Sequence, residues 1–137
     1  CGTSDSKKFI KQINNKSIKI TDFIENMSLA YSSADIVISR AGAIAISELV
    51  YFNKAMILIP LPSAAENHQE INANYLEKKN ACKKINQNKL CTGILETTIK
   101  ELLSNNTQIK YLEDNAGRNS KPDATQIIVN QIIEHIL

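Results

Sequence analysis

Short apolar runs alternate with helical patterns through the middle of the chain, joined by a few polar residues. The runs at 17–20, 35–38, 55–59 and 83–85 indicate strands by their length and isoleucine content. Between them, apolar residues recur at helical spacing, which predicts helices over about 24–33, 44–52 and 68–79. Strands alternating with helices predict an α/β fold, with a Rossmann-like parallel sheet and flanking helices.

Helical patterns also flank this alternation, at 7–13, 92–104 and 107–116. A last helix opens at Lys121-Pro-Asp-Ala-Thr125 and runs to Leu137, with Pro122 in its first turn. The run Ala55–Ile59 is apolar at every position, as expected for a strand covered on both faces. The 137 residues contain no linker of domain size, so we expect one domain over 1–137.

The composition excludes several classes of protein. Sixteen basic against 14 acidic residues give a net charge of only +2, without the basic excess of a nucleic-acid binder. No apolar run approaches the roughly 18 residues of a membrane span, and no signal peptide is visible. Three cysteines without CxxC spacing favour a reducing cytoplasmic setting. We therefore expect no nucleic-acid partner, no metal and no cofactor.

The most informative stretch is the small-residue turn that follows the strand at 35–38. The apolar run stops at Ser39-Arg-Ala-Gly-Ala43, and a helical pattern carrying Glu48 begins at once. In an open parallel sheet this order builds a ligand site. The turn lets a ligand approach the backbone, and the helix points unpaired N–H groups at an anion. The pattern favours a phosphate or nucleotide site.

Three residues of this stretch have both a binding and a structural interpretation. Glu48 could accept two hydrogen bonds from a ribose diol, or it could be a solvated helix carboxylate. Gly42 could permit close ligand approach or a positive φ, or be an ordinary turn glycine. Arg40 could neutralise a phosphate or pair with a nearby acid. The spacing leaves these alternatives open.

Two further segments carry groups that could recognise a sugar or a base. Glu66-Asn-His-Gln-Glu-Ile-Asn72 follows the proline-flanked end of the strand at 55–59 and gathers amide and imidazole groups. His68 could equally be an exposed residue at a helix start. Phe23-Ile24 could lie against a planar base or form a hydrophobic staple. No Walker A, GxGxxG, Gly-x-Ser-x-Gly or HExxH pattern occurs, and no residue resembles an activated nucleophile.

Taken together, these segments resemble a known family. The stretches Ile20–Met27, Ala34–Ala43, Ser47-Glu48, Ile59–Ala73 and Lys121–Thr125 closely resemble, in the same order, the C-terminal half of bacterial MurG glycosyltransferases. The resemblance spans essentially the whole chain. It implies the C-terminal, donor-binding domain of a GT-B fold. It also implies an inverting enzyme that transfers N-acetylglucosamine from UDP-GlcNAc to lipid I, making lipid II for peptidoglycan.

The resemblance assigns residues to the UDP part of the donor. Ile24 would contact uracil through its backbone, with Phe23 beside the base. Glu48 would bind the ribose hydroxyls. The diphosphate would meet backbone N–H groups at the helix start, those of Gly42, Ala43 and Ile44. Ala45 stands where other members carry a hydroxyl residue.

The sugar would be recognised from the segment after the proline-flanked strand end. Gln69 would bind the GlcNAc hydroxyls together with His68, which stands where some members carry a second glutamine. Asn72 matches the family pattern and would fix the loop. Arg40 is counted among the donor-binding residues.

The resemblance also implies parts that this chain does not carry. These are an acceptor-binding N-terminal domain with the candidate catalytic base, and a Gly-Gly-Ser-Gln-Gly loop of the donor domain. Cys1-Gly2 would end the strand after that loop's helix, so the domain would lack its first strand–helix unit. No catalytic residue would lie in this chain, and lipid I and the cytoplasmic face of the inner membrane would be met through the missing domain. The alternatives are a UDP-GlcNAc 2-epimerase-like GT-B enzyme, or a non-catalytic donor-binding subunit that needs a partner chain.

Overall fold

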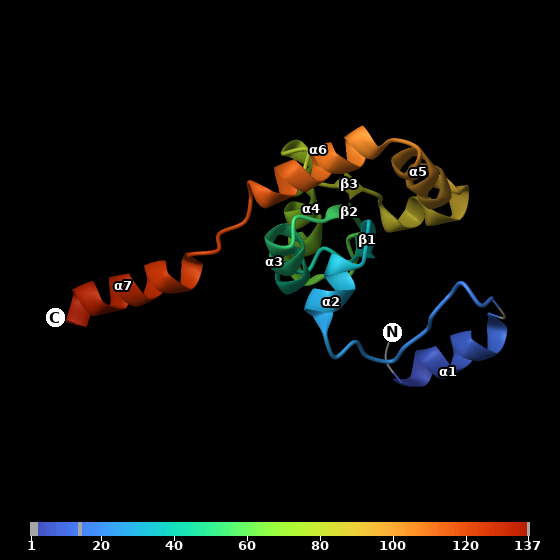
Figure 1. Ribbon diagram of the computed structural model, residues 1–137, viewed down its shortest axis with the longest axis horizontal. Helices are drawn as coiled ribbons and strands as arrows, with labels where there is room; N and C mark the ends of the chain where they lie inside the picture. The colour runs from blue at the N-terminus through green and yellow to red at the C-terminus, as the bar shows by residue number, and fades with distance from the viewer. Residues whose placement is uncertain (1–2, 14, 137) are drawn as a thin grey trace. The chain divides into compact units, whose positions relative to one another are not determined.

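The computed structural model describes residues 3–13 and 15–136, in two compact units, Cys1–Ser33 and Ala34–Leu137. The first unit contains α1 (Thr3–Gln12) and α2 (Met27–Ser32), which Figure 1 shows in blue and cyan. Asn26 caps α2, because its Oδ1 accepts a hydrogen bond of 2.9 Å from the Leu29 N–H. Cys1-Gly2, expected as a strand end, lies outside the described residues.

The strand predicted over 17–20 is not present, and this prediction is wrong. The backbone N–H of Ile18 donates to the Asn15 carbonyl at 3.1 Å, so a turn occupies the place of the strand. Ile18 is 50% exposed. A short strand is stable only beside a neighbour that completes its hydrogen bonds, and the structure pairs 17–20 with no strand among the residues it describes.

The second unit is built on a parallel sheet with the order β1-β2-β3. Its strands and intervening helices are β1 (Ile36–Ser39), α3 (Ala43–Tyr51), β2 (Ala55–Leu58), α4 (His68–Lys78) and β3 (Lys83–Lys84). Ile36 pairs with Ala55, and Ile57 with Lys83. The prediction of a parallel α/β sheet with flanking helices is confirmed.

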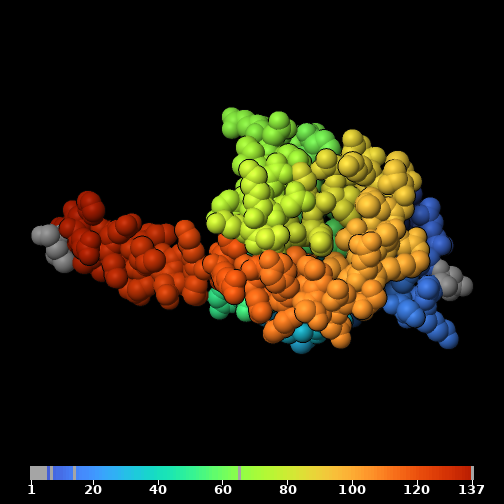
Figure 2. Space-filling view, turned by 90° about the horizontal axis from the view of Figure 1, so that it is seen from above, coloured from blue at the N-terminus to red at the C-terminus, as the bar shows by residue number. Residues whose placement is uncertain are grey.

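The remaining elements follow the sheet in the chain. They are α5 (Ile94–Leu103), α6 (Asn106–Gly117) and α7 (Ala124–Ile136), with the short 3₁₀ turns η1 (Ala65–Asn67) before α4 and η2 (Gln87–Thr92) before α5. Figure 2 shows α6, in orange, lying against α5, in amber. The helices predicted at 92–104, 107–116 and the chain end are confirmed with small shifts of their bounds.

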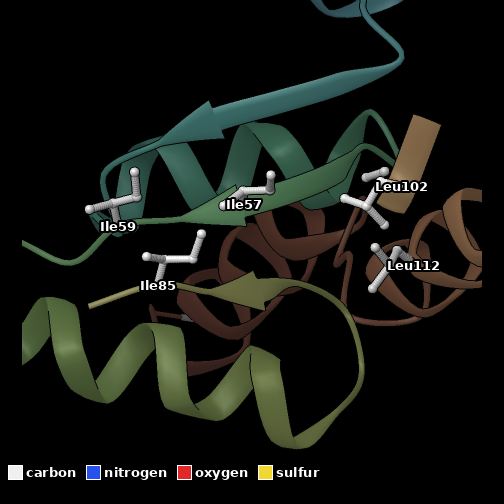
Figure 3. Packing of buried hydrophobic residues seen from close by; sticks show 6 residues of the cluster. Ile57, Ile59, Ile85, Leu102 and Leu112 are labelled. Atoms are coloured by element: carbon white, nitrogen blue, oxygen red, sulfur yellow. The ribbon is translucent and has the colours of Figure 1, made fainter. Parts of the chain in front are cut away.

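The core lies on both sides of β2. Ala55, Ile57 and Ile59 pack with Ile85, and with Leu102 of α5 and Leu112 of α6, as Figure 3 shows for the labelled residues. Side chains alternate along a strand, so Met56 and Leu58 face the opposite side, and both are fully buried. The continuous apolar run at 55–59 is explained by this two-sided burial.

The parallel arrangement brings two turns to one edge of the sheet. β1 ends at Ser39 and β2 at Leu58, and these two residues pair. The Ile59 N–H continues the ladder by donating to the Ser39 carbonyl at 2.9 Å. The turn into α3 and the loop into α4 therefore leave from the same carboxyl edge, where ligands bind in open α/β sheets.

Candidate functional site

The turn into α3 leaves the helix N-terminus open. Gly42 is the N-cap residue, with φ −70° and ψ 146°, and among the described residues no side chain caps the helix there. A Cβ added to Gly42 would meet no atom within 4 Å. The positive-φ interpretation of Gly42 is therefore wrong, whereas the space for close ligand approach is present.

The first turn of α3 presents unpaired donors to this space. The first intrahelical bond runs from the Ile46 N–H to the Gly42 carbonyl at 3.0 Å, so the preceding amides have no acceptor within the helix. Ile44 is 80% exposed, which keeps the turn accessible. Amides of Ala43, Ile44 and Ala45 at a positive helix end form an anion-binding arrangement.

Glu48 lies on the same helix, beyond the open turn. It is half-buried and lines a cavity of about 500 Å³, together with Ser47, Tyr51 and the segment Asn119–Pro122. Its carboxylate therefore stands at the wall of a concave surface and is neither fully solvated nor sealed in the core. This location suits a group that accepts hydrogen bonds from a ligand.

Arg40 joins the two turns of the carboxyl edge. Its Nη1 donates to the carbonyls of Ile59 at 3.2 Å and Pro60 at 3.4 Å. The pairing with an acid that the sequence allowed is not found among the described residues. The guanidinium donates hydrogen bonds to two main-chain carbonyls just beyond β2 and so fixes the start of the loop that leads to α4.

Two side chains of α4 form hydrogen bonds with the loop that follows β2 and with the turn into α3. Gln69 Oε1 accepts a hydrogen bond from the Leu61 N–H at 3.0 Å, and Asn72 Nδ2 donates to the Ala41 carbonyl at 3.1 Å. His68 is exposed at the helix start, next to Gln69. These bonds bring the amide-rich segment and the open turn of α3 to one edge of the sheet.

The loop before α4 has an unusual backbone. Glu66 and Asn67 have φ values of 51° and 55°, in the left-handed region. Asn67 is the N-cap of α4 and makes no side-chain cap bond. Left-handed conformations at residues other than glycine cost free energy, and they persist where the surroundings hold them. The hydrogen bonds of Gln69 and Asn72 help to hold the backbone in this conformation.

Phe23 and Ile24 belong to the first unit. Phe23 is 77% and Ile24 42% exposed, and both line a cavity of about 570 Å³ with Thr21 and Leu29. Thr21 Oγ1 donates to the Phe23 carbonyl at 2.8 Å and holds the turn in which both residues lie. An exposed aromatic ring beside a cavity provides a flat apolar surface.

Sequence reasoning missed one polar cluster beside this edge. Lys84 Nζ contacts Glu70 Oε1 at 2.8 Å and Asn74 Oδ1 at 2.6 Å, and lies 3.9 Å from Glu77 Oε2. The available signal was the pair Lys83-Lys84 in a strand, because alternation forces one of two adjacent lysines toward the covered face.

The described ranges add neither a metal site nor a membrane-spanning helix, and one of their free cysteines is inert. Cys82 is buried, and burial raises the pKa of its thiol to about 12, so it stays protonated at neutral pH. Residues 3–13 and 15–136 contain no group of three His, Cys, Asp or Glu side chains placed to hold a metal ion. None of the described helices has the length and apolarity to cross a membrane.

These features define a class of protein. The second unit is a parallel α/β domain whose carboxyl edge joins an open helix N-terminus to an amide-rich loop, and the helix that starts there carries a carboxylate in a cavity wall. Comparison with known proteins makes the class specific. The model of the glycosyltransferase family 28 C-terminal domain matches residues 1–128, and the chain belongs to this family.

Two of the relatives that match most of this chain carry the same name. A protein of Idiomarina loihiensis is 41% identical over 88% of this chain, and one of Cytophaga hutchinsonii is 40% identical over 93%. Both are named UDP-N-acetylglucosamine--N-acetylmuramyl-(pentapeptide) pyrophosphoryl-undecaprenol N-acetylglucosamine transferase. The chain spans 33% and 34% of their lengths, about a third of each.

A solved structure agrees with these relatives. The crystal structure of Acinetobacter baumannii MurG superposes with a TM-score of 0.87 at 29% identity, over 98% of this chain and 41% of that one. The prediction of a MurG-type C-terminal domain with the GT-B architecture is confirmed.

Proposed function

We propose that this chain is the donor-binding part of a glycosyltransferase that moves N-acetylglucosamine from UDP-GlcNAc to lipid I, giving lipid II in peptidoglycan synthesis. Its family and the shared name of its relatives support a transferase over the 2-epimerase alternative. Because the chain spans about a third of those relatives, we place the acceptor site and the catalytic base in a further domain. That domain would also meet the cytoplasmic face of the membrane.

The observation that carries this proposal is the arrangement along α3. Its open first turn offers the amides of Ala43 and Ile44, with Gly42 leaving room for a diphosphate. Glu48 follows on the same helix at a cavity wall. A diphosphate at the helix start and a ribose diol at the carboxylate are the two halves of nucleoside diphosphate recognition. In the first unit, Phe23 and Ile24 would take the uracil.

The sugar would be recognised at the start of α4. Gln69 directs its Oε1 to the Leu61 amide, so its Nε2 is the group left to donate to a GlcNAc hydroxyl. His68, exposed beside it, would add a second polar contact. Asn72 and Arg40 would act by fixing the two turns that present these groups.

The chemistry implied for the complete enzyme is displacement at the anomeric carbon with inversion. A base outside this chain would take the proton of the acceptor hydroxyl as that oxygen attacks. The bond to UDP breaks, and the negative charge that develops on the leaving phosphate is met by the α3 amides and helix dipole. This chain would thus bind the donor and stabilise its leaving group.

The proposal is tested by calorimetric titration of the chain and a Glu48→Ala variant with UDP and UDP-GlcNAc. Losing a charged hydrogen-bond pair costs roughly 1.5–3 kcal/mol, so we expect affinity for both ligands to fall about 10- to 150-fold. Glu101→Ala, which removes an exposed carboxylate from α5, is the matched control and should bind like the parent chain. Equal binding by Glu48→Ala would remove Glu48 from the site, and a parent chain that binds neither ligand would contradict the proposal.

A further inference from the structure

Lys84 is the most enclosed cation in the ion pairs of the described residues. Its side chain is 15% exposed, and its Nζ lies 2.8 Å from Glu70 Oε1 and 2.6 Å from Asn74 Oδ1. Glu77 Oε2, at 3.9 Å, is a third neighbour. Glu70, Asn74 and Glu77 lie at helical spacing along one face of α4, so a single ammonium group ties the first two turns of this helix to β3.

Lys84 is itself held firmly by the sheet. It pairs with Leu58, the last residue of β2, and Leu58 is fully buried. The Ile85 N–H donates to the Leu58 carbonyl at 3.0 Å and continues this pairing. The backbone of Lys84 is therefore a fixed point beside the end of β2, and from there its side chain reaches α4.

The start of α4 depends on such a fixed point. Asn67 provides no side-chain cap, and the two residues before the helix are in the left-handed region. The helix start is held by Gln69 to Leu61, by Asn72 to Ala41 and by Glu70 to Lys84. Glu70 directly follows Gln69, so the bond between Lys84 and Glu70 holds the helical turn that carries Gln69, the residue we assign to the sugar.

We propose that Lys84 is a positioning residue for recognition of the donor sugar. It holds the first turn of α4, and with it Gln69, at the location from which a GlcNAc hydroxyl can be bound. This inference rests on the proposed function and extends it to a residue that touches no part of the donor. The neighbours of Lys84 are Glu70, Asn74 and Glu77, and none of them is among the groups assigned to UDP, which lie on α3 and in the first unit.

Removing the ammonium group should not unfold the domain. The side chains of Glu70 and Glu77 are 42% and 46% exposed, so water can solvate both carboxylates once the lysine is gone. Methionine in place of Lys84 retains the apolar stem at a covered position. The carboxylate of Glu70 would then be free to turn toward solvent, and the first turn of α4 would lose its connection to the sheet.

The test compares two affinities in each variant of the 137-residue chain, for UDP-GlcNAc and for UDP, measured by calorimetric titration well below the thermal midpoint. Because Lys84 acts through Gln69, its removal can cost no more than the Gln69 hydrogen bond to the sugar, so we expect Lys84→Met to weaken UDP-GlcNAc binding about three- to fivefold. UDP binding should stay within about twofold of the parent value. Lys84→Arg, which keeps the charge and the donors, should restore most of the preference for the sugar nucleotide.

Lys100→Met is the control, because it breaks a 2.6 Å ion pair with Glu96 that is 73% and 71% exposed on α5. It should change neither affinity. A Lys84→Met variant that loses UDP and UDP-GlcNAc binding equally would show a merely structural role and overturn the inference. A variant that keeps both affinities would overturn it as well. A parent chain without preference for UDP-GlcNAc over UDP would instead contradict sugar recognition by this chain, and the inference would fall with it.

Discussion

The side-chain amide of Gln69 is oriented by a main-chain donor. The Leu61 N–H can only donate, so the atom that lies 3.0 Å from it is the amide oxygen, and the Nε2 donors point elsewhere. The site therefore offers the sugar a donor at this position. Gln69 therefore has two separate roles: its Oε1 holds the loop through the Leu61 amide, which is the structural task, and its Nε2 is left to bind the sugar, which is the binding task.

Gln69→Glu removes only the binding task. Glutamate retains an oxygen for the Leu61 amide and replaces the donor with an acceptor, so the ratio of UDP-GlcNAc to UDP affinity should fall. One lost hydrogen bond of about 1 kcal/mol corresponds to a roughly fivefold change in this ratio. Gln69→Leu, which loses both ends, should lower the thermal midpoint in addition. Paired titrations and thermal melts check this, and an unchanged ratio in Gln69→Glu would place the sugar elsewhere.

At the residue level, the sequence predicted which side chains are suited to binding better than it predicted their hydrogen-bond partners. The position of Glu48 on α3, beyond the open turn, follows from its spacing, which a helix fixes locally, whereas the cavity beside it is completed by the distant segment Asn119–Pro122. The partners of Arg40 do not, because the carbonyls of Ile59 and Pro60 lie 19 and 20 residues further along the chain. Such contacts depend on which strands become neighbours, and that information is not local.

The ends of α3 and α6 approach each other closely. Asn53, just beyond α3, has φ 51°, and a Cβ built on Gly117 at the end of α6 would lie 2.6 Å from Asn53 Oδ1. The close approach therefore favours glycine at position 117, and the left-handed conformation at 53 is one that asparagine tolerates. The ends of the two helices can lie this close because residue 117 has no Cβ atom.

Gly117→Ala should destabilise the chain through this contact. The Asn53 side chain can rotate partly away, so we expect a modest loss of about 1 kcal/mol, visible as a lower denaturation midpoint. Asn53→Gly removes the obstructing atoms and accepts the positive φ. In that background Gly117→Ala should cost much less, and the double-mutant cycle measures the difference. Additive effects of the two substitutions would show that the helix ends do not clash.

At the level of elements, the helices were predictable and some of their surroundings were not. The helical pattern at the chain end gave α7, yet Ile128, Ile132 and Ile136 are 56%, 52% and 76% exposed within the described residues. Periodicity reports which face of a helix is apolar, not what covers it. The segment 17–20 failed as a strand for a related reason, because an extended run becomes a strand only when a neighbour accepts its hydrogen bonds.

At the scale of the whole molecule, the chain combines a near-neutral composition with one concentrated polar edge. Its net charge of +2 gives no broad field to attract a nucleoside diphosphate. Recognition would instead come from oriented groups, namely the α3 amides and the side chain of Gln69 at the carboxyl edge of the sheet, and the side chain of Glu48 further along α3. The sequence predicted this edge because strand ends and turns follow from local patterns, whereas the bonds from α4 that stiffen it required the fold.

This distribution of charge predicts that UDP binding to the chain does not depend on a divalent cation. If the diphosphate is neutralised by the helix N-terminus, then excess chelator and excess Mg²⁺ should give UDP affinities that agree within about twofold. Calorimetric titration in the two buffers at equal ionic strength makes the comparison, since salt alone screens the helix dipole. Blocking access of the diphosphate to the α3 amides should lower the UDP affinity more than removing the divalent cation does. Gly42→Val, which fills the open space above the turn, should therefore weaken UDP binding equally in both buffers. A tenfold or greater loss of affinity in chelator would show instead that a metal ion carries the charge compensation that we assign to α3.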